Sequence, residues 1–189
     1  MSGIVGSRLN IRGSGLVGSL GTDGQVLTSS GAGVGAVYEA AAGGVNTPLF
    51  RSRISTTFTV SNEVYTKIAF DTCSGTTGVQ DFIVSGSYDT TNNKWTPGEA
   101  GYYQITAQLY AYTETAFDYW YILIRLNGGS DFLNSTVYQD IYGSVSCTGI
   151  AHLQSTDYVD VVGYQDVGSD LNLSASHSMT HFSGFKLIS

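Results

Sequence analysis

The chain has little charge, little proline and little cysteine for its length. Lys, Arg, Asp and Glu make up only 12% of its 189 residues, and it holds 2 Pro and 2 Cys. So few charges exclude a charge-rich linker protein and argue against a long helix or coiled coil. With a formal net charge of −7, the chain also lacks the basic surface that displaces counterions from phosphates, so nucleic acid is not an expected partner.

Long apolar segments are absent as well. No run approaches the roughly 18 apolar residues of a membrane-spanning helix, so membrane insertion is not expected. Residues 1–30 contain no cationic stretch followed by an apolar run, so we expect no signal peptide for secretion. Cys73 and Cys147 are too few for a disulfide framework. Small buried thiols in a reducing compartment are the favoured interpretation, and a single bridge between the two stays open.

Glycine is abundant but unevenly distributed. Twelve of the 24 Gly fall in residues 1–44, a segment whose one aromatic residue is Tyr38. This composition cannot bury enough apolar surface to fold alone. We predict that residues 1–50 form an arm that docks on another protein, with a brief strand at 25–28; a disordered tail is the alternative. The expected docking side chains are Leu9, Ile11, Val26 and Leu27.

Residues 51–189 show the two-residue periodicity of strands packed on a core along one face. The clearest cases are 102–112, where Tyr103, Ile105 and Leu109 alternate with polar neighbours, and 119–126, where Trp120 and Ile122 do so. Further strands are expected at 54–60, 66–70, 82–88, 144–153, 158–164 and 182–188; 131–141 and 166–178 are expected loops, with a short strand near 136–138. About eight to ten short strands and no helical periodicity predict an all-β domain, an antiparallel sandwich or barrel.

Tyrosine recurs on the faces of these strands that point away from the expected core. Tyrosine combines a large apolar ring with a polar tip, which suits subunit interfaces and ligand platforms. We therefore predict that the outer faces meet neighbouring subunits in an oligomer. The predicted interface residues are Tyr102, Tyr110, Tyr112, Tyr119 and Tyr121.

Motifs within about residues 52–189 stand in the order found in one known family. Pro97-Gly98-Glu99-Ala100-Gly101-Tyr102 enters the first long strand, Ile124-Arg125-Leu126-Asn127-Gly128 ends the second, and Phe182-Ser183-Gly184-Phe185 begins the last. With these motifs the segment resembles the globular head of complement component C1q, a jelly roll related to tumour necrosis factor. The resemblance implies a jelly-roll sandwich that forms a tight homotrimer. Thr156 stands where the family has Gly, and no collagen repeat precedes the head, so complement-type activity is not carried over.

The first segment has a resemblance of its own. Residues 20–33 read LGTDGQVLTSSGAG, which is similar to a Gly-Thr-x-Gly-Gln-Val-Leu-Thr-Ser-x-Gly element of bacteriophage tail-fibre and other virion proteins. Residues 3–18 are similar to the N-termini of small structural proteins of marine phages. The resemblance implies a virion component, assembled in the host cytoplasm, whose arm docks on other virion proteins.

Candidate metal ligands and catalytic groups are few. His177 and His181 are spaced for one strand face and would bind a metal on a trimer axis, although ordinary polar loop residues are the favoured interpretation. No Asp-x-Asp-x-Asp-Gly loop is present, but calcium held between subunits stays open, with aspartates in or near predicted loops as its ligands: Asp118, Asp131, Asp140, Asp166 and Asp170. No nucleophile elbow or phosphate-binding loop occurs. We assign no catalytic residue and no cofactor, and we do not expect an enzyme.

These observations predict a trimeric short fibre or adhesin of a bacteriophage particle. Its arm would dock on the virion, and its jelly-roll head would contact a host-surface glycan or protein. One alternative is a capsid decoration or head-fibre protein with a stabilising role. Two others are a bacterial cell-surface carbohydrate-binding module, which would need a secretion signal, and a polysaccharide depolymerase.

Overall fold

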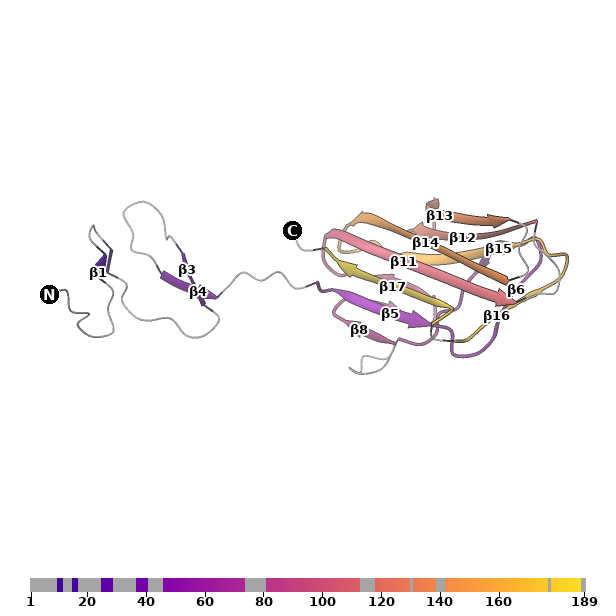
Figure 1. Cartoon of the computed structure of the whole chain (residues 1–189), viewed down its shortest axis with the longest axis horizontal. Helices are drawn as coiled ribbons and strands as arrows, with labels where there is room; N and C mark the ends of the chain where they lie inside the picture. Colours follow the sequence, from indigo (N-terminus) through magenta and orange to yellow (C-terminus); the bar gives the residue numbers. More distant parts are fainter. Residues whose placement is uncertain are drawn as a thin grey trace. The chain divides into compact units, whose positions relative to one another are not determined.

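The computed structural model describes residues 10–11, 15–16, 25–28, 37–40, 46–73, 81–112, 118–129, 131–138, 142–176 and 178–187. Contacts divide the chain into two units, Met1–Gly44 and Val45–Ser189. The second unit is a sandwich of two antiparallel sheets (Figure 1). Since the described residues contain only strands and irregular segments, they include no helix that could cross a membrane. The prediction of an all-β sandwich is confirmed.

One sheet of the sandwich, which we call the β12 sheet, has the strand order β13-β12-β15-β10-β9, with β7 paired to β15. Every strand pair in it is antiparallel. Its strands are β7 (Thr66–Lys67), β9 (Ser87–Asp89), β10 (Lys94–Thr96), β12 (Tyr119–Leu126), β13 (Asp131–Tyr138) and β15 (Val159–Gln165).

The other sheet, which we call the β11 sheet, has the order β6-β16-β11-β17-β5-β8, with β14 paired along the full length of β11. Its strands are β5 (Leu49–Arg53), β6 (Phe58–Val60), β8 (Phe82–Val84), β11 (Gly101–Tyr112), β14 (Tyr142–Leu153), β16 (Leu171–Leu173) and β17 (His181–Lys186). The sandwich unit begins at Val45, and β5 already starts at Leu49, so the first strand of the head spans the boundary expected at residue 50.

The two long strands that are most regular in sequence lie in opposite sheets. In β11 the predicted inward residues Tyr103, Ile105 and Leu109 are fully buried, and in β12 so are Trp120 and Ile122. β11 and β12 do not pair with each other; each is paired on both sides by other strands. Their inner faces therefore supply the two halves of one core, which is why the alternation is so clear in the sequence.

Aromatic side chains fill the centre of the core. The ring of Phe50 stacks on that of Trp95 with centroids 4.4 Å apart, and it meets Phe182 edge-on at 4.8 Å. Tyr103 is buried with them, and its hydroxyl donates a hydrogen bond of 2.8 Å to the Glu99 carbonyl oxygen. Phe50 comes from β5, Trp95 from β10 and Phe182 from β17, so this cluster holds both sheets together.

Five segments differ from the sequence-based prediction, one of them 66–70, where only β7 is a strand. The strand expected at 82–88 is two strands, β8 and β9, because Ser85 and Gly86 adopt positive φ angles of 61° and 73° and turn the chain. The segment 54–60 is a strand only at β6. The expected loop 131–141 contains the eight-residue strand β13, and the expected loop 166–178 contains β16, whose residues Leu171 and Leu173 reach the core.

The first unit contains two short antiparallel pairs. β1 (Asn10–Ile11) pairs with β2 (Gly15–Leu16), and β3 (Gln25–Thr28) pairs with β4 (Val37–Ala40). The strand predicted at 25–28 is thus present as β3.

Candidate functional site

The outer face of the β12 sheet carries a buried ion-pair cluster at one end. The Asp160 side chain is 1% exposed, and its carboxylate contacts Arg125 Nε at 2.8 Å and Lys67 Nζ at 2.8 Å. Strand register places Arg125 directly opposite Asp160 and Lys67 opposite Val162. Arg125 also donates a second bond of 2.9 Å from its other nitrogen, so the pair is bidentate. This cluster ties β7, β12 and β15 together.

The other end of the same face carries tyrosines that register brings side by side. Tyr119 lies opposite Tyr138 of β13, and Tyr121 lies opposite Thr136. On its other side, Tyr121 lies opposite Tyr164 of β15. Because facing residues of paired strands point to the same side, all five side chains project outward from one patch of sheet.

Tyr65 completes the patch from the segment that precedes β7. This segment is held by backbone and side-chain bonds: Glu63 N donates to the Gln165 carbonyl at 2.8 Å, and Gly168 N donates to Asn62 Oδ1 at 2.7 Å. The Tyr65 ring contacts the Tyr164 ring with centroids 4.7 Å apart and meets Tyr121 nearly perpendicularly, at 6.4 Å and 81°. Tyr65 is 62% exposed, so its ring stands at the rim.

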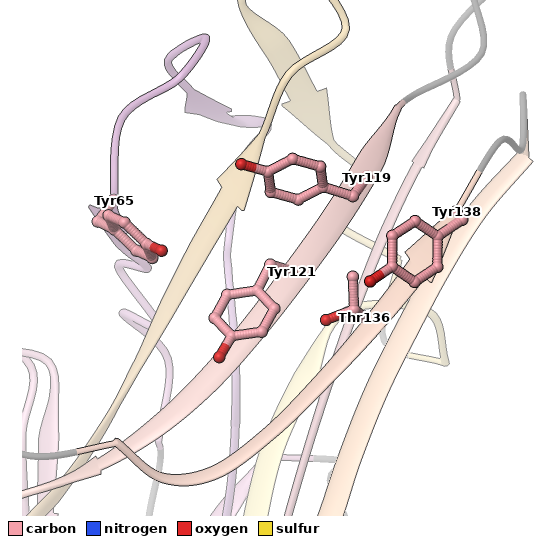
Figure 2. Close-up of a pocket in the computed structure, with 5 residues that line it drawn as sticks. All are labelled: Tyr65, Tyr119, Tyr121, Thr136 and Tyr138. Carbon is pink, nitrogen blue, oxygen red and sulfur yellow. The ribbon is translucent and has the colours of Figure 1, made fainter.

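These side chains enclose a shallow hollow of about 320 Å³, which we call the tyrosine hollow. Figure 2 shows its five lining residues, with the Tyr119 and Tyr121 rings rising from β12 and Thr136 between Tyr121 and Tyr138. Tyr164 does not line the hollow, but its ring stacks on that of Tyr119. The lining combines aromatic rings with hydroxyl groups and contains no charged side chain: Tyr65, Tyr119, Tyr121, Thr136 and Tyr138.

The electrostatic surroundings of the hollow are negative. The pKa of Tyr164 is raised to about 12, chiefly by its hydrogen bond with the Tyr119 hydroxyl, with Glu63 and Asp166 adding to the shift. Burial raises the pKa of Tyr121, and the Asp131 charge adds to this effect. Asp166 also accepts a bond of 2.8 Å from Tyr119 N. Tyr164 and Tyr121 therefore keep their protons at physiological pH, and carboxylates lie around the hollow.

The structure divides the five tyrosines predicted to form a subunit interface. Tyr119 and Tyr121 belong to the tyrosine hollow, whereas Tyr102 and Tyr110 project from β11 in the opposite sheet. Tyr102 is 56% exposed and lies against the His152 ring at 4.8 Å. Tyr112 ends β11, paired with Tyr142. The two groups therefore occupy opposite outer faces of the sandwich.

The outer face of β11 and β14 is largely uncharged. Gln104, Thr106 and Gln108 of β11 lie opposite Ile150, Thr148 and Ser146 of β14, and Thr148 Oγ1 bonds to Thr106 Oγ1 at 3.0 Å. Ile150 is 63% exposed. An exposed isoleucine beside an exposed tyrosine on a sheet face is a feature typical of contact surfaces between proteins.

The described aspartates and histidines among the candidate metal ligands do not line the hollow. In the described part of the chain, no group of three or more His, Cys, Asp or Glu is arranged to hold a metal ion. Asp118, Asp131 and Asp166 lie beside strand ends of the β12 sheet, and Asp170 bonds to Asn62 N at 3.1 Å. His181 is in β17; His177 and Asp140 fall outside the described residues.

Both cysteines are free thiols. Burial, together with the charge of Asp81, raises the pKa of Cys73 to about 12, and its sulfur donates to the Phe82 carbonyl. Burial raises the pKa of Cys147 as well. Neither thiol is activated for nucleophilic chemistry, because the thiolate is the reactive form.

Among the predicted docking residues of the first unit, Ile11 lies in β1, and Val26 and Leu27 lie in β3, where Leu27 is exposed. Leu9 falls outside the described residues.

Sequence reasoning missed four residues of the patch: Tyr65, Thr136, Tyr138 and Tyr164. Thr136 and Tyr138 are spaced two apart, which is the signal of a shared strand face, but the surrounding segment was interpreted as a loop. Tyr65 and Tyr164 come from separate segments, and only strand pairing brings them to the hollow.

Comparison with solved structures supports the fold. One similar structure is described as the Eiger TNF from S. frugiperda, with a TM-score of 0.53 over 74% of this chain and 90% of that chain, at 14% sequence identity. The sandwich is thus a jelly roll of the tumour necrosis factor type, as the resemblance to C1q heads implied. No protein-family model matches the sequence, and no curated protein matches it either.

Proposed function

We propose that the chain is a non-enzymatic attachment protein of a bacteriophage particle. Its jelly-roll head forms a homotrimer and contacts the host surface, and its N-terminal arm docks on other virion proteins. The observation that carries the attachment role is the tyrosine hollow, an aromatic and hydroxyl-lined recess on an exposed sheet face. Recesses of this kind bind ligands by apolar contact and a few oriented hydrogen bonds.

The proposed subunit contact uses the face of β11 and β14. That face offers exposed Tyr102 and Ile150 and a row of neutral polar side chains, so copies can meet there without burying charge. It lies on the sheet opposite the tyrosine hollow. Association through it leaves the hollow open for a ligand.

The virion location is supported by the arm motif at residues 20–33, LGTDGQVLTSSGAG, and is tested by deletion. A chain that lacks residues 1–44 should form trimeric heads that no longer join particles. Incorporation of the shortened chain at the normal level would contradict the docking role. Trimer formation of the same variant, measured by sedimentation, separates a docking defect from a folding defect.

Copy number distinguishes attachment from the rival of a capsid decoration. Quantitative mass spectrometry of purified particles should count this chain as a small multiple of the portal protein. A count close to that of the major capsid protein would favour decoration instead. The hollow also suits a bacterial cell-surface carbohydrate-binding module, and absence of the chain from particles would favour that function.

A further inference from the structure

The chemistry of the tyrosine hollow restricts what it can bind. The rings of Tyr121 and Tyr138 stand on neighbouring strands with the Thr136 hydroxyl between them (Figure 2). A pyranose ring presents C–H groups on its faces and hydroxyls at its edge. The C–H groups pack on the electron-rich face of an aromatic ring, and the sugar hydroxyls pair with phenol and threonine hydroxyls. The lining offers both kinds of contact.

The surrounding charge is unfavourable to acidic sugars. Residues 45–189 carry thirteen Asp and Glu against six Lys and Arg, and Glu63, Asp131 and Asp166 all act on the tyrosines of the patch. Lys67 and Arg125 are on the same sheet face, but both are held by Asp160. A ligand carboxylate or sulfate would meet carboxylates, and every nearby cation is already paired with Asp160.

The other basic residues of the sandwich are engaged elsewhere. Arg53 pairs with Asp81, Lys186 pairs with Glu99, and Lys94 lies 4.4 Å above the Tyr158 ring. Arg51 also has an interaction of its own. None of these residues lines the hollow.

A quaternary ammonium group is the other ligand that tyrosines and nearby carboxylates favour, by cation–π attraction. The ring geometry argues against it. Tyr164 already stacks on the Tyr119 ring at 5.3 Å and 7°, and it also contacts the Tyr65 ring. Two of the four rings in the lining are therefore partly covered, which leaves a platform with hydroxyls rather than an aromatic cage around a point.

We propose that the tyrosine hollow is a binding site for an uncharged pyranose, with Tyr121 and Tyr138 as stacking residues and the Thr136 hydroxyl as an orienting group. Its volume of about 320 Å³ is at the lower end of ligand pockets and suits one or two sugar rings. This inference rests on the proposed attachment function in one respect: that function makes a neutral glycan of the host surface the source of the sugar. The recognition chemistry itself depends only on the hollow.

The test measures binding of the full chain to defined probes by saturation-transfer NMR and on a printed glycan array. The neutral probes are methyl glycosides of glucose, galactose and N-acetylglucosamine; the charged probes are glucuronic acid, N-acetylneuraminic acid and choline. We expect saturation transfer to at least one neutral glycoside and little to the charged probes. Preferential binding of an acidic sugar or of choline, or binding of no neutral glycan, overturns the inference.

Matched variants assign the binding to the hollow. Tyr121→Ala and Thr136→Val should weaken neutral-glycan binding by about tenfold or more, equivalent to about 1.4 kcal/mol. Val84→Ala removes an exposed apolar side chain from β8 of the opposite sheet, outside the proposed subunit contact, and should bind as the parent does. Equal losses in all three variants, or none in the first two, would place the ligand elsewhere. Circular dichroism confirms that each variant is folded.

Failure of this inference and failure of the proposed function give different results. A chain that is incorporated in particles but binds no neutral glycan remains a virion protein without this site. A chain that binds neutral glycans through Tyr121 but is absent from particles keeps the site and loses the virion role.

Discussion

Tyr119 and Tyr164 stack almost in parallel, with ring centroids 5.3 Å apart and an interplanar angle of 7°. They are diagonal neighbours on adjacent strands, since Tyr164 lies directly opposite Tyr121. The Tyr119 side chain is also the main cause of the raised pKa of Tyr164. The Tyr119 ring of the hollow is therefore packed against Tyr164, and the same contact raises the pKa of Tyr164.

Stability should fall at high pH because folded-state tyrosines hold their protons. The pKa values of Tyr164 and Tyr103 are raised to about 12, whereas an unfolded tyrosine titrates near about 10. The stability that these two tyrosines add by holding their protons is fully present below about pH 10. It is lost as the pH rises toward about 12. Urea unfolding at increasing pH, followed with tyrosinate absorbance, measures this loss. A midpoint that stays constant across that range would contradict it.

Substitution of Tyr164 should affect ligand binding through Tyr119 and Tyr65, whose rings it contacts. Tyr164→Phe keeps the ring and should retain neutral-glycan affinity within about twofold. Tyr164→Ala removes the support and should weaken binding severalfold in a folded protein. An alanine variant with parental affinity would show that the hollow does not depend on this contact.

The Asp160 carboxylate should be one of the most important single charges for stability. Asp160→Asn removes the buried partner of Arg125 and Lys67, and we expect a loss of about 2–3 kcal/mol, below the full cost of breaking a buried pair because both cations reach solvent. Chemical denaturation measures the change. Asp118→Asn, an exposed site, is the control and should change the free energy of unfolding by less than about 0.5 kcal/mol. Equal losses of unfolding free energy in the two variants would argue against a stabilising role of the Asp160 ion pairs.

Gly149 is required where β14 passes β13. A Cβ atom at this position would overlap the Leu133 side chain, which is packed against the core. Gly149→Ala should destabilise the sandwich by about 1–3 kcal/mol through overpacking. At Gly129 the nearest atom to an added Cβ is 3.6 Å away, so Gly129→Ala serves as the control. Thermal unfolding of both variants tests the difference, and equal stabilities would contradict the packing argument.

The proposed subunit contact predicts that a charge at Ile150 prevents association. Ile150→Asp should yield folded monomers, because the carboxylate would be buried unpaired in the interface. Val84→Asp places the same charge at an exposed residue of β8 in the same sheet and should leave the trimer intact. Sedimentation velocity reads the outcome. A trimeric Ile150→Asp variant would place the contact on another face.

Strands with apolar inner faces could be predicted from the sequence. Strands with few buried apolar residues could not. In β11 and β14 nearly every second residue is buried, so alternation alone identifies both. β13 escaped prediction because its inner face is only partly buried and its pairing shifts register beside Ile124. β16 holds just two apolar residues, Leu171 and Leu173, inside a polar segment.

The site was harder to predict than the fold for a physical reason. Alternation shows that Tyr119 and Tyr121 point outward, but it does not tell what lies beside them. Strand register brings Tyr164 and Tyr138 to their sides, and a turn held by Gln165 and Asn62 brings Tyr65. Alternation alone therefore could not show that the outward tyrosines of β11 and β12 lie on opposite faces of the sandwich.

Competition for host adsorption tests the attachment role most directly. Host cells are incubated with the purified full chain before particles are added, and the rate of particle adsorption is measured. We expect that the parent chain and Val84→Ala slow adsorption at saturating concentration, while Tyr121→Ala leaves it close to the uninhibited rate. Unchanged adsorption in the presence of the parent chain, or equal inhibition by Tyr121→Ala, would contradict attachment through the tyrosine hollow.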